Sequence, residues 1–367
     1  MTSLYRKHSK CCIFQIVRKK KNMDLSNFKT FPSLIAPLPA NQWCDTNMPV
    51  QFSLEGKGHI FGETVLEQRL TGNKKLNLMA DDEQWLLFLL SAALRANVDG
   101  VVNLVCGCPE STLQANQKIL EKFSGKTFTL NTPEGTKIIG FASIWAIYEA
   151  IAHAYGIRTY LGLKEEVFTV SVGFGTVEGI ILLDNGKPAL ETLIGDQRLG
   201  MRRAAIIFKN KLKSFSPREP DSGGSDAWYD TLLRDSYQRN PNSYLLGAGG
   251  EIDLETRKSL ADESLNEYAE TILAPRLIEH MAAQVGKKIT FCLTGGGALY
   301  APIANVIKKH AENSGFGFTL ADEKLALMSA GIGYTVLAAS KKELQQHDTL
   351  VVDLGNCNTV CQLLSFH

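Results

Sequence analysis

Three glycine-containing turns, each directly after an apolar strand-like run, most constrain how this 367-residue chain can fold. They are Ser171-Val172-Gly173-Phe174-Gly175-Thr176, Thr294-Gly295-Gly296-Gly297 and Asp353-Leu354-Gly355-Asn356-Cys357-Asn358-Thr359. Glycine lets a backbone turn tightly and approach a ligand closely, while Thr and Asn side chains add hydrogen-bond donors. Two such hairpins facing each other can grip a polyphosphate, and a glycine triplet before a helix can seat an adenosine at the helix N-terminus. The pattern therefore predicts nucleotide binding.

This prediction rests on the set of three turns and not on any one of them. A single glycine turn between two strands is usually only a turn. The sequence contains neither G-x-x-x-x-G-K-[ST] nor a G-x-G-x-x-G that opens a βαβ unit, so the two common phosphate-binding signatures are absent.

Strand-like and helix-like patterns are mixed along the chain, which predicts the α/β class. We predict strands at residues 50–54, 59–61, 101–105, 168–172, 179–183, 289–293, 350–354 and 359–364. We predict helices at residues 82–96, 111–123, 142–155, 301–312 and 324–339. Gly156 is expected to close the helix at 142–155 as a left-handed cap, and Pro275 to kink or divide a helix within 254–285.

The length of the chain favours two lobes over a single core. We predict a first lobe from residues 24–165 plus 330–367, and a second lobe from residues 166–329. Residues 1–23 hold many Lys and Arg and are expected to be a disordered leader, or to precede a translation start at Met23, with a transit peptide or a membrane-surface tail as further alternatives.

Charge and cysteine content narrow the class of partner and the compartment. The 39 basic and 38 acidic residues give a net charge of +1, so neither nucleic acid nor a membrane is expected as a direct partner. The apolar run at residues 85–94 is too short to span a bilayer. The eight cysteines are scattered without a second pair at ligand spacing, which predicts reduced thiols in a cytoplasmic protein.

Taken in order, the motifs resemble those of the actin, sugar-kinase and heat-shock ATPase superfamily, and most of all those of ParM- and MreB-type bacterial actins. Asp353-x-Gly355-x-x-Asn358-Thr359 resembles the phosphate-1 loop, Gly173-x-Gly175-Thr176 the phosphate-2 loop, and Thr294-Gly295-Gly296-Gly297-Ala298 the adenosine motif. Further similarities cover Phe31-Pro32-Ser33, Gly62-Glu63, Gly107-x-Pro109, the first connecting helix (Ser143-Ile144, Ala146, Tyr148-Glu149) and the second (Ala330-Gly331).

The resemblance implies a two-lobed actin-like (ribonuclease H-like) fold that binds ATP or GTP with Mg²⁺. Asp353 would hold the metal ion through water and take part in catalysis. The nucleotide would contact Ser171, Gly173, Phe174, Gly175, Thr176, Gly200, Gly295, Gly296, Gly297, Gly355, Asn356, Cys357, Asn358 and Thr359.

The order of the motifs departs from the family, because the phosphate-1 loop normally comes first and here comes last. We therefore interpret the chain as a circular permutant, with residues 340–348 as the linker that joins the original ends.

Two substitutions bear on hydrolysis. Ser171 stands where the family's phosphate-2 loop begins with Asp, and Ala142 aligns with the glutamate that orients the attacking water in ParM-type proteins. Phosphoryl transfer depends on positioned charge and a held water, so hydrolysis is expected to be slow. Glu134 is the alternative candidate for the water-orienting group.

The resemblance further implies an ATP-driven, filament-forming protein in plasmid or DNA segregation or in cytoskeletal positioning. Its partners would be further copies of itself and a DNA-bound adaptor protein. The alternatives are a non-polymerising or hydrolysis-poor nucleotide-binding scaffold of the same fold, and a small-molecule kinase.

Overall fold

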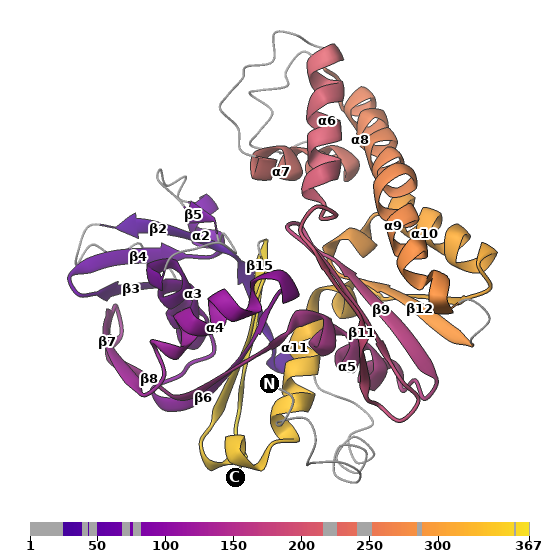
Figure 1. The fold of residues 1–367 in the computed structure, drawn as a ribbon. Helices are drawn as coiled ribbons and strands as arrows, with labels where there is room; N and C mark the ends of the chain where they lie inside the picture. The colour runs from indigo at the N-terminus through magenta and orange to yellow at the C-terminus, as the bar shows by residue number, and fades with distance from the viewer. Residues whose placement is uncertain are drawn as a thin grey trace. The chain divides into compact units, whose positions relative to one another are not determined.

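The computed structural model describes residues 25–38, 43, 50–67, 74–75, 82–215, 226–240, 252–284, 288–355 and 357–366 (Figure 1). The chain divides into two compact units, of which unit 1 is Met1–Leu163 with Met328–His367 and unit 2 is Lys164–Leu327. Both boundaries lie two residues from those expected. The leader expected at residues 1–23 lies outside the described residues.

Unit 1 is built on a ten-stranded sheet with the order β1-β15-β14-β6-β8-β7-β3-β4-β2-β5. Its strands are β1 Lys29–Pro32, β2 Leu34–Leu38, β3 Gln51–Leu54, β4 Lys57–Phe61, β5 Lys74–Lys75, β6 Gly100–Cys108, β7 Lys126–Thr132, β8 Gly135–Tyr148, β14 Thr349–Leu354 and β15 Asn358–Leu364. The C-terminal hairpin lies inside this sheet, because β14 runs parallel to β6 and β15 is antiparallel to both β14 and β1.

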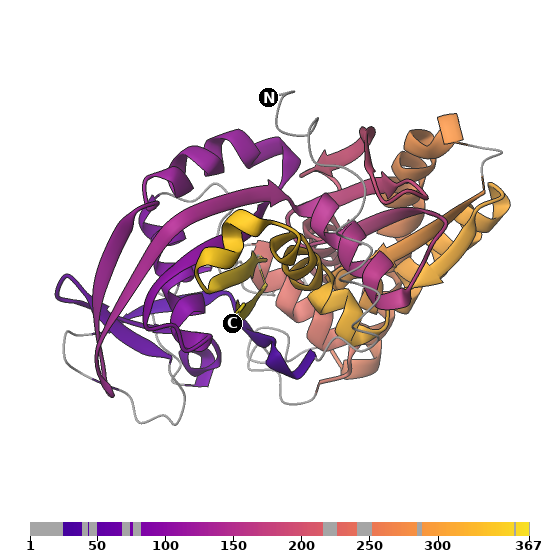
Figure 2. The same cartoon turned by 90° about the horizontal axis from the view of Figure 1, so that it is seen from below.

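Helices cover both faces of this sheet (Figure 2). They are η1 Leu25–Asn27, α2 Glu63–Glu67, α3 Asp82–Arg95, η2 Glu110–Thr112, α4 Leu113–Glu121, α5 Glu149–Leu161, α11 Glu323–Ala339 and η7 Lys342–Gln346. Leu350 and Val352 of β14 share the apolar core with α3. Successive side chains of a strand point to opposite faces, so Asp353 lies on the other face. On that face Gly331 of α11 packs against Val360 of β15.

The prediction of a helix at residues 142–155 is wrong for its first half. Residues 142–148 belong to β8, and α5 begins at Glu149. These residues pair in parallel with β6 up to Tyr148, and bulky side chains such as Trp145 and Ile147 suit a strand. Gly156 does not cap the helix. The left-handed cap is Gly162, with φ of 67°.

Unit 2 is built on a five-stranded sheet with the order β11-β10-β9-β12-β13. Its strands are β9 Glu166–Val172, β10 Val177–Leu182, β11 Pro188–Asp196, β12 Ile289–Thr294 and β13 Gly317–Leu320. Its helices are α6 Arg202–Phe215, α7 Asp226–Tyr237, α8 Leu254–Tyr268, η4 Ala269–Leu273, α9 Ala274–Met281, η5 Ala282–Gln284, η6 Gly296–Leu299 and α10 Ala301–Asn313. Pro275 lies at the start of α9, directly after the π-helical turn η4, which confirms that the helical pattern is divided there.

The two sheets contain the same five-strand arrangement. In unit 2 the β9–β10 hairpin is extended by antiparallel β11 on one side and by parallel β12 and β13 on the other. In unit 1 the β14–β15 hairpin is extended by antiparallel β1 on one side and by parallel β6 and β8 on the other. The hairpin comes first in the chain in unit 2 and last in unit 1.

Candidate functional site

In unit 2, the turn between β9 and β10 is closed on itself and bonded to the start of α6. The Gly173 N–H donates to the Thr176 carbonyl at 2.9 Å, and the Met201 N–H donates to the Gly173 carbonyl at 2.9 Å. A Cβ at Gly200 would lie 2.4 Å from the Phe174 carbonyl oxygen. Only glycine fits at this position, so Gly200 and the turn form one rigid backbone unit.

The glycine triplet after β12 meets the end of β9. Gly295 has a φ of +80°, and a Cβ there would lie 2.6 Å from Ser171 Oγ. A Cβ at Gly297 would lie 2.4 Å from Val172 Cγ1, whereas a Cβ at Gly296 would meet no atom of the described residues within 4 Å. The triplet therefore packs its first and third residues against β9 and leaves Gly296 facing open space.

Aromatic side chains that the sequence did not single out lie beside the triplet. The rings of Tyr237 and Tyr300 pack edge to face with centroids 5.0 Å apart. The Tyr237 hydroxyl accepts the Ala301 N–H at 3.1 Å, and the Lys258 ammonium lies 4.4 Å from the Tyr237 ring centroid. Tyr237 and Lys258 lie far from the triplet in sequence, on α7 and α8, so no local motif could have indicated them.

In unit 1, Ser33 fixes the turn between β14 and β15. Its hydroxyl donates to the Gly355 carbonyl at 2.5 Å and lies 2.9 Å from Thr359 Oγ1, and its N–H donates to the Cys357 carbonyl at 2.9 Å. Thr359 is thus buried and bonded within the protein, while Asn358 is exposed. Asn356, another predicted contact of the nucleotide, lies outside the described residues.

Asp353 lies near the end of β14, and Glu149 begins α5 directly after β8. The parallel pairing of β14 with β6 and of β6 with β8 brings these strand ends to one edge of the sheet. Asp353 is only 9% exposed, and burial, followed by the charge of Glu149, raises the pKa of its carboxyl well above the usual range. Two carboxyl groups therefore meet at this edge. The second was missed because the sequence placed Ala142, and not Glu149, at the start of the helix.

Gly107, near the end of β6, and Tyr334 of α11 contact each other at the same edge of the sheet. A Cβ at Gly107 would lie 1.5 Å from the Tyr334 hydroxyl, so the absent side chain makes the space that the hydroxyl fills. Burial, followed by the charges of Asp353 and Glu149, raises the pKa of Tyr334. Burial also raises the pKa of the Cys106 thiol to about 12, so this thiol stays protonated and unreactive.

Glu134 is placed far from these groups. It lies exposed in the turn between β7 and β8, where it pairs with Lys137 at 3.7 Å. From there β8 runs on the order of 40 Å to Tyr148 at the strand rise. Glu149, and not Glu134, therefore lies at the sheet edge with Asp353.

The chemistry of Asp353 fits a hard cation. Carboxylate oxygen is the ligand that Mg²⁺ prefers, and a cation would offset the cost of ionising a buried carboxyl. Within the described part of the chain, no three His, Cys, Asp or Glu side chains gather as a metal-binding cluster. One carboxylate with water and phosphate oxygens is, however, a common set of ligands for Mg²⁺.

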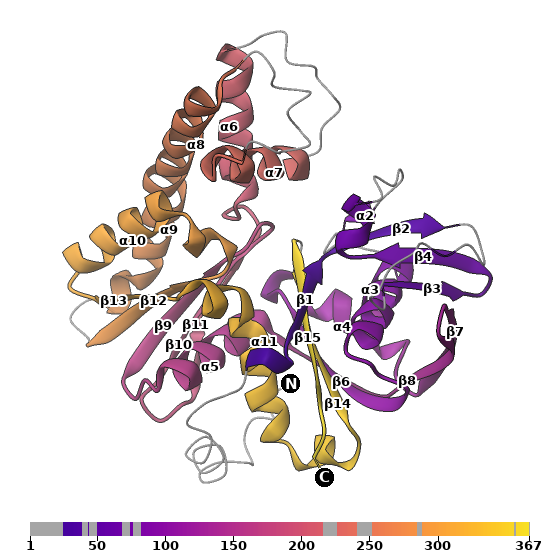
Figure 3. The same ribbon diagram turned by 180° about the vertical axis from the view of Figure 1, so that it is seen from behind.

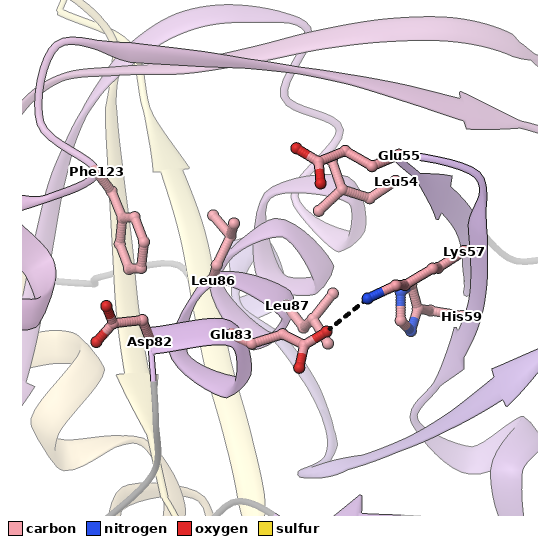
Figure 4. A pocket seen from close by; sticks show the side chains of 9 residues that line it. All are labelled: Leu54, Glu55, Lys57, His59, Asp82, Glu83, Leu86, Leu87 and Phe123. Atoms are coloured by element: carbon pink, nitrogen blue, oxygen red, sulfur yellow. Dashed lines mark ion pairs between the residues drawn. The ribbon is translucent and has the colours of Figure 1, made fainter.

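A cavity of about 240 Å³ lies elsewhere in unit 1, between the β3–β4 hairpin and α3 (Figure 4). Leu86, Leu87 and Phe123 contribute apolar surface, and Lys57 pairs with Glu83 at 3.6 Å. None of the predicted nucleotide-binding residues lines it, so we do not assign the candidate site to this cavity. No helix in the described ranges is both long and apolar enough to cross a membrane.

Comparison with solved structures identifies the fold. An archaeal actin homolog, Ta0583, matches with a TM-score of 0.64 at 14% identity, over 85% of this chain and 92% of that chain. A non-polymerisable quadruple mutant of pCBH ParM matches with a TM-score of 0.60 at 17% identity, over 85% and 93% of the two chains. Bacillus thuringiensis ParM with ATP matches with a TM-score of 0.52 at 14% identity, over 84% and 90%.

No model of a known protein family matches the sequence, and no curated protein matches it either. The structural similarity alone shows that the chain has the actin-like α/β fold, as the motifs predicted.

Proposed function

We propose that the chain binds ATP, or GTP, with Mg²⁺ through the glycine turns of unit 2 and the Asp353 hairpin of unit 1. The observation that carries this proposal is the meeting of the β9–β10 turn, Gly200 and the glycine triplet, which are distant in sequence and packed so closely that side chains are excluded. Within the triplet, Gly296 faces open space among the described residues, and a nucleoside would lie there. Structures similar to this chain were solved with ADP and with ATP.

Each group has a role in this proposal. The backbones of the turns at Gly173–Thr176 and Gly355–Thr359 would bind phosphate oxygens, and Asp353 would hold Mg²⁺ through its waters. The ion would supply positive charge that offsets the charge of the phosphates. Glu149 would orient the attacking water and accept its proton. Ser171 stands where the phosphate-2 loop of the family begins with Asp, so one acidic group is missing and we expect slow hydrolysis.

We also infer that the C-terminal hairpin is the first hairpin of an actin-like fold, relocated by circular permutation. The shared five-strand arrangement supports this inference, because β14 and β15 occupy the sheet positions in unit 1 that β9 and β10 occupy in unit 2. The segment expected to be the linker contains the short helix η7, whose Leu344 is buried.

We further propose that the protein is cytoplasmic and assembles into filaments when it binds ATP, with a DNA-bound adaptor as a partner in plasmid or DNA segregation or in cytoskeletal positioning. The similarity to ParM structures supports assembly, and a head-to-tail interface that does not close produces an open filament. The second candidate function is a hydrolysis-poor, non-polymerising scaffold, which Ser171 favours.

Sedimentation and negative-stain microscopy of the full-length chain, with and without Mg-ATP, test this proposal. We expect ATP-dependent pelleting and filaments. Glu149→Gln should pellet at least as well, because it keeps the nucleotide contacts while phosphate release falls by about 10²- to 10⁴-fold. Tight ATP binding without any polymer at high protein concentration would contradict filament formation and support the scaffold.

A further inference from the structure

A row of side chains leads from Glu149 of α5 to Ser329 of α11. The two helices lie side by side (Figure 3). His153 follows Glu149 by one helical turn, and its Nε2 lies 3.7 Å from Glu149 Oε1. The other ring nitrogen, Nδ1, lies 2.7 Å from Ser329 Oγ of α11. His153 is 5% exposed and Ser329 is fully buried, so solvent does not compete for the contact between them. The Glu149 side chain is 20% exposed, so its end of the row is open to a further partner.

The backbones of α5 and α11 fix the positions of the Glu149, His153 and Ser329 side chains. A Cβ at Gly156 of α5 would lie 1.9 Å from the Ser329 carbonyl oxygen, and a Cβ at Gly333 of α11 would lie 1.8 Å from the Ala152 carbonyl oxygen. Each helix therefore approaches the other through a glycine. The hydroxyl of Ser329 is held beside the ring of His153 by backbone packing and not only by its own hydrogen bond.

The hydrogen bond with Ser329 determines whether Nε2 of His153 presents a proton or a lone pair to Glu149. If the hydroxyl donates to Nδ1, the proton of the neutral ring lies on Nε2 and points to the carboxylate. If the ring is doubly protonated, Nε2 also carries a proton. The remaining tautomer would direct the lone pair of Nε2 at a carboxylate, which is repulsive. The favourable states thus present an N–H to Glu149 and leave its second oxygen for another partner.

We propose that His153, oriented by Ser329, is a positioning residue for the Glu149 carboxylate in nucleotide hydrolysis. This inference rests on the proposed function. His153 touches neither nucleotide nor water in this account. His153 acts by restricting the position of the Glu149 side chain, which orients the attacking water. A misplacement of such a group by about 1 Å lowers the rate roughly 100-fold.

Two substitutions at His153 separate positioning from packing. In His153→Gln the amide nitrogen can reach the place of Nε2 and present an N–H to Glu149, whereas in His153→Asn it reaches only the place of Nδ1 and can bond Ser329. We expect phosphate release to fall about 10- to 100-fold in His153→Asn and to stay within about threefold of wild type in His153→Gln. ATP affinity should change less than about twofold in both. Wild-type rates in both variants, or a faster Asn variant, would overturn the proposal.

A second measurement needs no nucleotide. The ¹⁵N chemical shifts of the His153 ring, assigned by comparison with His153→Gln, should show a protonated Nε2 in the wild-type chain. In Ser329→Ala the fraction of ring with its proton on Nδ1 should increase. A bare Nε2 in the wild-type ring would overturn the proposal. A wild-type chain that bound no ATP would instead contradict the proposed function, and the ring measurement alone would then decide the arrangement of His153.

Discussion

Asp353 is the residue at which stability and the proposed function conflict. Its carboxyl is buried beside Glu149, so its charged form loses hydration and meets a second carboxyl group. The folded chain tolerates this position because the group can stay protonated when no cation is present. A bound cation would reverse the preference, which is the behaviour expected of a metal-binding acid at a strand end.

A pH-dependent stability difference follows from this shift. In the folded state the pKa of Asp353 is raised above its ordinary value of 3.8, so the folded chain binds more protons than the unfolded chain above that pH. The stabilisation of the protonated form is complete below pH 3.8 and is lost as the pH rises through the folded-state pKa. Asp353→Asn removes the ionisable group. Without metal, it should therefore melt at a higher temperature than wild type, by a margin that grows as the pH rises from 3.8 towards the folded-state pKa and is constant above it.

Each unit of raised pKa corresponds to about 1.4 kcal/mol. In a protein of this size, 1 kcal/mol shifts the melting temperature by roughly 1–2 °C. Differential scanning calorimetry of both chains in a chelating buffer measures the effect. A margin that does not change with pH would contradict the assigned cause.

At the scale of elements, two glycines determine how closely α5 and α11 approach each other. A glycine inside a helix normally costs about 1 kcal/mol relative to alanine. Gly156 and Gly333 lie at positions where a Cβ would strike backbone atoms of the other helix. The two helices are therefore locked at a short distance, and the Glu149–His153–Ser329 chain depends on that distance.

Gly156→Ala should therefore destabilise the protein although it raises helix propensity. The colliding atom is a backbone carbonyl oxygen that cannot rotate away, so we expect a loss of about 2–4 kcal/mol in the free energy of unfolding. Gly331→Ala is the matched control, because the atoms nearest its Cβ would belong to side chains, at 3.1 Å for Phe28 and 3.3 Å for Val360. Urea denaturation should find the control within about 1 kcal/mol of wild type. Equal effects of the two substitutions would argue against the backbone lock.

The boundary between β8 and α5 could not be predicted from local sequence patterns. Residues 142–148 combine Ala, Ile, Trp and Tyr, which suit a buried helix and a buried strand equally well when only local periodicity is considered. The parallel ladder with β6 decides for a strand, and that partner lies about forty residues earlier in the chain. This early start of the predicted helix made Ala142 the expected water-orienting position and obscured Glu149.

At the scale of the whole chain, the mixture of strand-like and helix-like patterns predicted the α/β class, and the ordered set of motifs predicted the actin-like fold by resemblance. The actin-like fold is confirmed by the structural comparisons. The hairpin turns at Gly173 and Gly355 lie at the strand ends where they were expected. Contacts from remote elements could not be predicted, such as Ser33 in the C-terminal turn and Tyr237 beside the glycine triplet, because they exist only after the sheets have formed.

The most direct test of the central claim is calorimetric titration of the full-length chain with Mg-ATP, using wild type, Gly296→Val and Asp353→Asn. Gly296 faces open space, so a valine there should leave the melting temperature of the nucleotide-free chain unchanged while it occupies the place of the nucleoside. We predict one ATP per wild-type chain and at least about tenfold weaker binding, or roughly 1.4 kcal/mol, in each variant. Undiminished ATP affinity in Gly296→Val would contradict the account.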